Sequence, residues 1–262
     1  MRFAVSIPPF TDVSTVVELA QDAEQAGWDG VFLWDHLRWR PRVRPDVHDP
    51  WVLLGAIATV TERVRLGTLI TPLARRRPWV VAKHMTTLDH LSGGRATLGV
   101  GLGEPPEEDF AAFGDPADPV TRGQLLDEGL AVLDALLRGD HCVHHGRHLD
   151  VDAELTPPPV QRPRPPIWVG GVAPNARPRR RAEGWDGFVP IGEPFLTPAA
   201  LAAYVGDKPR PDWDVVASWA PGVPADEFAD AGATWLVEST DPDGDWVGEF
   251  RDRVRRNPRD DR

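Results

Sequence analysis

The sequence predicts an α/β protein whose fold is a (β/α)8 TIM barrel with an excursion after the fourth strand. Short apolar runs bounded by Gly, Pro or Thr alternate with helical patterns along the chain. The length of 262 residues is close to the roughly 250 residues typical of this barrel. The clearest unit is a strand at 65–72, a helix at 78–92 and a strand at 95–104. Such a βαβ unit requires parallel strands and a right-handed crossover.

The elements before this unit follow from apolar runs and helix-end signals. Gly27 can end a helix in the left-handed conformation, and Asp49 followed by Pro50 gives an N-cap and a first-turn proline. The expected elements are a strand at 3–7, a helix from Asp12 or Ser14 to Ala26, a strand at 30–34, a proline-rich loop at 37–45 and a helix from Asp49 to Thr61.

The regular alternation stops after residue 103 and resumes at residue 167. Between these points we expect an acidic excursion at 104–119, a helix at 121–137, a hairpin outside the barrel at 141–151 and a proline-dense connector at 155–166. The remaining expected strands are 167–171, 187–191, 214–219 and 234–238, and the remaining helices are 177–183, 197–205, 224–231 and 246–256. We expect one domain at 1–256 and a frayed, charged tail at 257–262.

Composition excludes several classes of protein. A formal net charge of −11 argues against a nucleic-acid binder, which needs a basic face. The single cysteine, Cys142, excludes an internal disulfide and a cysteine-built metal site. No uninterrupted apolar stretch is long enough to span a membrane, and no apolar signal segment comes before the first strand. We therefore expect a cytoplasmic protein.

Candidate site residues lie at the carboxyl ends of the strands, where TIM barrels carry their active sites. His36, after the second strand, can shuttle protons near neutral pH, although it can also merely hydrogen-bond a loop. Gly170 and Gly171 can bring backbone N–H groups to an anion, although glycine pairs also serve tight turns. The other candidates at these ends are Pro9, Phe10, Asp35, residues 68–71, residues 101–104, Val172, Pro190, Trp219 and Glu238.

Two further patterns bear on the ligand. Three arginine clusters, at 38–44, 75–77 and 179–181, follow strands and could form a positive rim for an anionic ligand. Solvated loop arginines are the alternative. The glycines of residues 99–103 are spaced by two throughout and lack the GxGxxG register, so we reject a dinucleotide fingerprint.

Four motifs resemble the luciferase-like flavin- and deazaflavin-dependent oxidoreductases. Residues 27–37, GWDGVFLWDHL, resemble the family's GFDSVWVSDHL, and residues 61–73, TERVRLGTLITPL, resemble its third strand. Residues 88–103 resemble its TLDxLSGGRxxLGVGxG, and residues 165–171 resemble its PPIWVGG. The motifs fall in order over residues 1–190. We identify the chain as resembling this luciferase-like monooxygenase family.

The resemblance implies an enzyme that uses reduced F420 or FMN to transfer a hydride to, or oxygenate, a small organic substrate. It implies His36 beside the cofactor ring, Glu104 as a proton donor, and Trp39 on the substrate side together with Phe10. It also implies a non-prolyl cis peptide near Leu69 and Ile70 and a homodimer. The implied cofactor-binding residues are Asp35, Thr68, Leu69, Ile70, Gly101, Gly170, Gly171 and Val172.

The sequence departs from the family after the glycine pair. Residues 174–187 replace the family's alanine-rich AARxADGW helix, and the segment after Gly192 is short, which implies a more open or differently lidded substrate pocket. F420 and FMN both stay open, as does a non-catalytic barrel that only binds flavin. A metal-dependent hydrolase using His36, His84, His90 and an Asp is disfavoured because His84 and His90 lie within a helix expected outside the barrel.

Overall fold

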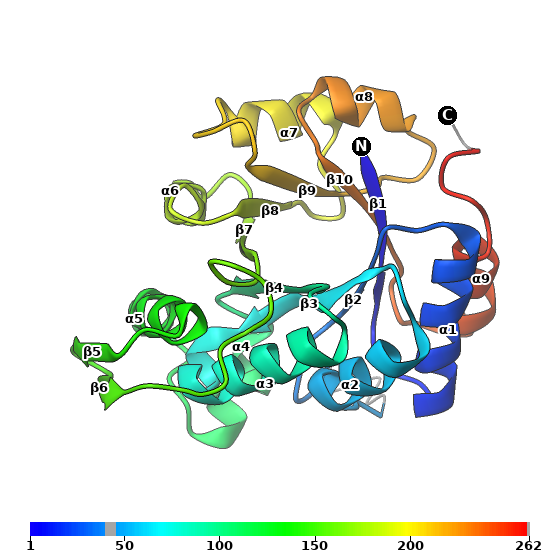
Figure 1. Cartoon of the computed structure of the whole chain (residues 1–262). Helices are drawn as coiled ribbons and strands as arrows, with labels where there is room; N and C mark the ends of the chain where they lie inside the picture. Colours follow the sequence, from blue (N-terminus) through cyan, green and yellow to red (C-terminus); the bar gives the residue numbers. More distant parts are fainter. Residues whose placement is uncertain (40–45, 261–262) are drawn as a thin grey trace.

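Eight parallel strands close into a barrel in the computed structural model, which describes residues 1–39 and 46–260 (Figure 1). The barrel closes because β1 pairs with both β2 and β10. This arrangement confirms the predicted (β/α)8 fold. Around the barrel the strands are β1 (Arg2–Ile7), β2 (Gly30–Leu33), β3 (Arg65–Pro72), β4 (Ala96–Gly101), β7 (Ile167–Val172), β8 (Gly187–Ile191), β9 (Asp214–Ser218) and β10 (Trp235–Ser239).

The helices begin and end on the signals that the sequence carries. Side chains of Asp49, Asp118 and Thr197 accept hydrogen bonds from the first-turn N–H groups of α2, α5 and α7. Gly27 and Gly139 end α1 and α5 at positive φ. The helices that follow strands are α1 (Val13–Ala26), α2 (Pro50–Val60), α3 (Pro78–Leu91), α5 (Pro119–Arg138), α6 (Ala176–Ala182), α7 (Pro198–Val205), α8 (Ala225–Asp230) and α9 (Trp246–Val254).

The excursion after β4 contains short helical turns and a hairpin that projects from the barrel (Figure 1). Glu128 of α5 holds the hairpin turn by accepting hydrogen bonds from the backbone N–H groups of Arg147, His148 and Leu149 at 2.9–3.0 Å. The expected hairpin outside the barrel is therefore present. The elements of the excursion are α4 (Pro106–Asp109), η2 (Ala111–Phe113), β5 (Cys142–His145) and β6 (Asp150–Ala153), and η1 (Leu73–Arg75) follows β3.

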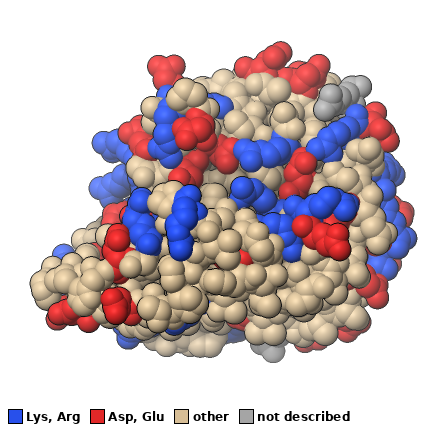
Figure 2. Space-filling model, in the orientation of Figure 1, with Lys and Arg blue, Asp and Glu red and all other residues tan. Residues whose placement is uncertain are grey.

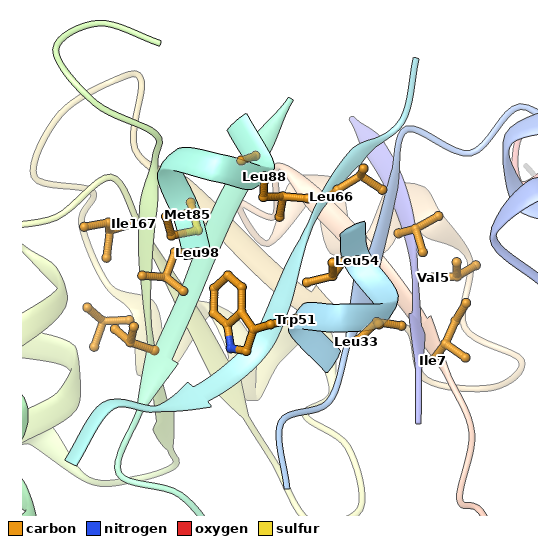
Figure 3. Close-up of a cluster of buried hydrophobic side chains, with 14 of the residues drawn as sticks. Val5, Ile7, Leu33, Trp51, Leu54, Leu66, Met85, Leu88, Leu98 and Ile167 are labelled. Atoms are coloured by element: carbon orange, nitrogen blue, oxygen red, sulfur yellow. The ribbon is translucent and has the colours of Figure 1, made fainter. Parts of the chain in front are cut away.

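Aromatic side chains fill the barrel interior. The ring of Phe32 lies 5.3 Å from that of Trp168 and 6.2 Å from that of Trp235, and the two indoles lie 5.4 Å apart. Leu69 and Ile191 pack on this cluster at the mouth end. Outside the barrel, side chains of α2 and α3 such as Trp51 and Met85 pack against the strands (Figure 3). A filled interior leaves the mouth as the place for a ligand.

The surface mixes charges, and the C-terminal residues pack on the barrel. In Figure 2 the basic side chains on the visible face are interspersed with acidic ones. Arg259 pairs with Asp29 at 2.8 Å and lies over the ring of Phe3, so residues 257–260 are held against the barrel, in contrast to the expected frayed tail. Residues 261–262 lie outside the described part of the chain. No helix of the described part is long and apolar enough to cross a membrane.

Candidate functional site

The floor of the barrel mouth is a bulge in β3. The register between β3 and β4 shifts between Thr68 and Thr71, and the peptide bond between Leu69 and Ile70 is cis. Gly101 on the neighbouring strand makes room for this bulge, because a Cβ there would lie 2.2 Å from Cδ1 of Ile70. The cis bond lies where the family resemblance implied it. The half-buried side chains of Leu69 and Ile70 face the mouth.

A cavity of about 1050 Å³ opens above this bulge, at the carboxyl ends of β2, β3, β4, β7 and β8. His36 and the Gly170–Gly171 turn line the same cavity, as the barrel reasoning required. The predicted site residues that line it are Asp35, His36, Trp39, Leu69, Ile70, Leu102, Gly103, Glu104, Gly170, Gly171 and Val172, and Trp34 at the end of β2 lines it as well. Trp219 and Glu238 line a separate hollow of about 630 Å³ that shares no lining residue with this cavity.

Three predicted residues lie behind the lining. Thr68 is fully buried, and its Oγ1 lies 2.9 Å from Oγ1 of Thr71 and 3.3 Å from the carbonyl oxygen of Gly99. Gly101 lies beneath Ile70. Phe10 is buried and packs on the ring of Trp39 at 5.7 Å. In the structure these residues support the bulge and the aromatic wall, and their direct contact with a ligand stays a prediction.

Asp35 is a buried anchor for the loop that carries His36. Its carboxylate accepts hydrogen bonds from Arg76 at 2.7 Å, Thr71 Oγ1 at 2.8 Å and Arg75 at 3.0 Å. Burial opposes ionisation, but the charges of Arg76 and Arg75 and the hydrogen bonds from Arg76 and Thr71 outweigh it and hold the pKa of Asp35 below its ordinary value. Asp35 is therefore an ionised structural partner of two arginines.

Among the described arginines of the expected positive rim, five have partners within the protein. Arg75 and Arg76 point inward to Asp35, because a buried carboxylate requires cationic partners. Arg181 pairs with Asp127 of α5, and Arg179 donates to backbone carbonyls of Val205 and Asp207, because α6 runs away from the mouth. Arg38 pairs with Glu108 at 3.0 Å. Arg40, Arg42 and Arg44 lie outside the described residues.

His36 is held by a carboxylate that the sequence did not identify. Its Nδ1 lies 2.9 Å from Oδ2 of Asp109, 73 residues further along the chain. The other oxygen, Oδ1, accepts hydrogen bonds from the backbone N–H groups of Leu37 at 2.9 Å and Arg38 at 3.0 Å. Asp109 is fully buried at the end of α4. The acidic run 107–109 was the only signal in the sequence, and such runs are normally solvated.

Aromatic rings surround the imidazole of His36. The ring of Trp39 lies 4.7 Å away, and the rings of Trp34 and Phe10 each lie 6.1 Å away. Trp34 donates its indole N–H to Ser6 Oγ at 2.9 Å. The wall beside the cavity is thus a packed aromatic surface that contains the imidazole of His36.

Glu104 lies at the rim of the cavity. Partial burial raises the pKa of Glu104 above its ordinary value, and the charges of Glu107 and Glu193 add to this rise, while Arg122 opposes it from 3.9 Å. Arg122, which the sequence analysis missed, is buried and donates to the carbonyls of Leu102 at 3.3 Å and Gly103 at 2.6 Å. The rim therefore pairs an acid with a fixed cation.

The opposite wall contains the glycine turn. A Cβ on Gly171 would lie 2.2 Å from Cβ of Pro178, and one on Gly170 would lie 2.9 Å from Cδ1 of Ile70. Packing alone thus favours glycine at these positions. Asn175 and Arg177 also line this wall and were missed. Among the described residues no carboxylate pairs with the exposed guanidinium of Arg177.

Two of the three histidines of the metal hypothesis, His84 and His90, lie away from the cavity. His84 packs on Trp51 at 5.2 Å on the outer side of the barrel, and His90 contacts the carbonyl of Pro158 in the connector. Burial lowers the pKa of His84, and the charge of Arg76 lowers it further. Within residues 1–39 and 46–260 no group of three or more His, Cys, Asp or Glu side chains is arranged to hold a metal ion.

Comparison with known proteins decides the family. The family model described as luciferase-like monooxygenase matches residues 1–219. The chain belongs to the luciferase-like monooxygenase family. Two curated relatives of this luciferase-like chain are called F420-dependent glucose-6-phosphate dehydrogenase. The relative from Microbacterium testaceum is 37% identical over 59% of this chain and 46% of its own length, and the one from Beutenbergia cavernae is 40% identical over 64% and 49%.

Solved structures agree with this family fold. The F420-dependent tetrahydromethanopterin reductase from Methanopyrus kandleri has a TM-score of 0.79, at 17% identity, covering 97% of this chain and 96% of that one. An F420-dependent secondary alcohol dehydrogenase with an F420–acetone adduct has a TM-score of 0.76, at 19% identity, over 97% and 99%. These likenesses show the fold. The luciferase-like chain spans about half the length of the two curated relatives.

Proposed function

We propose that this chain is an oxidoreductase that binds reduced F420 or FMN in the mouth cavity and acts on a small organic substrate. One observation carries the proposal: His36 in its aromatic wall and the glycine turn beside Arg177 border one cavity, on a floor made by Leu69 and Ile70 at the bulge of β3. A cavity of about 1050 Å³ is at the upper end of the range of cofactor sites.

The residues of this cavity fit a flat ring with an anionic tail. Leu69 and Ile70 present an apolar floor to a ring, and Gly170, Gly171 and Val172 present backbone next to Asn175 and Arg177. The guanidinium of Arg177, which pairs with no carboxylate of the described residues, suits a phosphate, to which arginine makes strong charge-assisted hydrogen bonds. When bound, the cofactor supplies the redox chemistry, and the protein supplies orientation and proton management.

F420 is the favoured cofactor, and hydride transfer is the favoured reaction. The two curated relatives and the two solved structures described above carry F420 in their names, and the FMN-containing 3,6-diketocamphane monooxygenase from Pseudomonas putida is a further structural neighbour, with a TM-score of 0.68 at 19% identity over 82% of this chain and 66% of that one. Ultrafiltration of the purified protein with each cofactor tests the choice. Retention of neither cofactor would contradict the proposal.

His36 and Glu104 are the proposed proton-handling groups. The imidazole of His36 faces the cavity beside Trp39, so it can exchange a proton with a substrate oxygen. Glu104, whose pKa is raised by partial burial, keeps its proton to a higher pH than an ordinary glutamate and can donate it. The alternative, a barrel that binds flavin without turnover, predicts that replacing His36 changes stability only.

We further propose a cytoplasmic homodimer that uses the face of α2 and α3. Helix α2 carries no charged residue, and Val52, Val60, Val80 and Leu91 of the two helices are exposed. A helix that is apolar on all sides is normally covered, and the uncharged surface of α2 suits a second copy of itself. The mass in solution tests this, and a single-chain mass would contradict it. The free thiol of Cys142 fits a reducing compartment.

A further inference from the structure

The buried carboxylate of Asp109 belongs to the excursion after β4 and contacts His36 on the proton-handling side of the cavity. We infer that Asp109 is a positioning residue that keeps the proton of His36 on Nδ1 and so presents Nε2 to the cavity. This inference rests on the proposed function of His36. It assigns a role to an acidic residue of the excursion that the sequence analysis did not single out.

The two oxygens of Asp109 have separate partners. Oδ1 accepts the backbone N–H groups of Leu37 and Arg38, which fixes the carboxyl plane against the loop after β2. Oδ2 is left for Nδ1 of His36 at 2.9 Å, with a guanidinium nitrogen of Arg75 at 3.9 Å. An aspartate carboxylate only accepts hydrogen bonds, so the nitrogen that faces it must donate.

This geometry decides where the proton of His36 is exchanged. A neutral imidazole carries one N–H, and the contact with Asp109 places it on Nδ1. A protonated imidazole carries both, and Nδ1 again donates to Asp109. In either state the proton that enters or leaves the ring does so at Nε2. A substrate hydroxyl would then give its proton to Nε2, and a substrate carbonyl being reduced would take one from it.

The excursion holds Asp109 rigidly enough for this role. Phe110, the next residue, is fully buried, lies under the guanidinium of Arg122 at 5.1 Å, and packs against Gly103, where a Cβ would lie 2.9 Å from its ring. Glu104 and Asp109 are thus parts of one packed segment. This segment therefore carries one proposed acid and orients the other proton-handling group.

The substitution Asp109→Asn tests the inference sharply because the loop orients the new amide. The N–H groups of Leu37 and Arg38 require an acceptor at the Oδ1 position, so the amide oxygen must face them and the amide NH2 must face Nδ1 of His36. A donor there forces Nδ1 to become the acceptor. We therefore expect the proton of neutral His36 to move from Nδ1 to Nε2.

The tautomer is read by ¹⁵N–¹H correlation spectra of the imidazole in the cofactor-free protein. We expect Nδ1–H in the wild type and Nε2–H in Asp109→Asn, and we expect kcat to fall about 10- to 100-fold, as for other partners that orient a histidine, with cofactor affinity unchanged within about twofold. The matched control is Glu108→Gln on the same turn, which removes the pair with Arg38 and leaves His36 as Nδ1–H.

The outcomes separate this inference from the proposed function. A wild-type spectrum with neutral His36 protonated on Nε2 overturns the inference even if no variant folds. Persistence of Nδ1–H in a folded Asp109→Asn protein, or a tautomer change in Glu108→Gln, overturns it as well. An Nδ1–H tautomer that switches in the variant, in a protein that retains neither F420 nor FMN, supports the positioning role while the proposed function fails.

Discussion

The two walls of the cavity are built in opposite ways. On the side of β2 and β3, Asp35, Arg75, Arg76 and Asp109 form buried ion pairs and hydrogen bonds behind His36. On the side of β7, the wall consists of backbone at the glycine turn and the exposed side chain of Arg177. The first wall uses its charges internally to fix one side chain, and the second leaves a cation for a ligand. Arginines close to a mouth therefore do not all serve binding.

The largest effect is expected on turnover from His36→Ala. Loss of a positioned general acid–base group lowers kcat by about 100- to 10,000-fold. Cofactor affinity should hold, because the second wall is untouched. Steady-state kinetics and cofactor ultrafiltration measure the two quantities, with His90→Ala on the outside of α3 as the matched control. Unchanged turnover would favour the non-catalytic alternative.

Asp35→Ala should produce the largest loss of stability. It leaves Arg75 and Arg76 buried without their carboxylate, and breaking a buried pair in this way costs about 3–5 kcal/mol. Denaturant unfolding measures the loss. Arg177→Ala, on the other wall, is the control and should change the free energy of unfolding by less than about 0.5 kcal/mol. Equal losses in both variants would mean that the walls do not differ.

The ion pairs of Asp35 with Arg75 and Arg76 also predict that the free energy of unfolding depends on pH. Because the folded pKa of Asp35 is lowered, its contribution is fully present above the unfolded value of about 3.9 and is lost as pH falls through the lower folded value. Unfolding curves of the wild type and Asp35→Ala should therefore converge as the pH is lowered below about 4. A constant difference down to the lowest accessible pH would contradict the pairing.

Arg177→Ala should weaken cofactor binding about tenfold, or about 1.4 kcal/mol, by removing the cation beside the glycine turn. The loss should shrink as salt is raised, since the guanidinium is exposed. Arg180→Ala on the same helix, whose side chain is outside the cavity lining, is the matched control. Titration of reduced or oxidised cofactor at two ionic strengths measures both effects.

The smallest effect is expected from Glu104→Gln. Glu104 is mostly exposed and water can substitute for it, so the loss of kcat should stay below about tenfold, under the roughly 100-fold typical of a well-placed acid. Activity that needs its proton is present below its raised pKa and declines as pH rises through that value. The variant should lose this alkaline decline. A pH–rate profile that keeps it would assign the decline to another group.

The sequence predicts the barrel well because each strand carries its own local signal. The run at 65–72 is apolar and turn-bounded, and the hairpin around Gly146 shows as alternation, so both are visible without tertiary information. Asp49 and Thr197 likewise mark their helix starts. Local patterns of this kind survive into the fold because barrel strands are buried on both faces.

The site is less predictable because it depends on contacts between distant segments. Nothing in the sequence joins His36 to Asp109, and the turn that brings them together depends on the burial of Phe110. The inward direction of Arg75 and Arg76 depends on the burial of Asp35, which only the packed fold reveals. The outward direction of Arg181, by contrast, follows from the fact that a barrel helix runs away from the mouth.

The rings of Phe32, Trp168 and Trp235 pack edge to face or tilted against one another and fill the barrel interior below the mouth. A ligand cannot pass through the molecule, so whatever enters by the rim must also leave by it. A cofactor lying on the cavity floor formed by β3 and a substrate above it would share one entrance. In that arrangement the cofactor would bind before the substrate and leave after it, so binding and release would follow a fixed order.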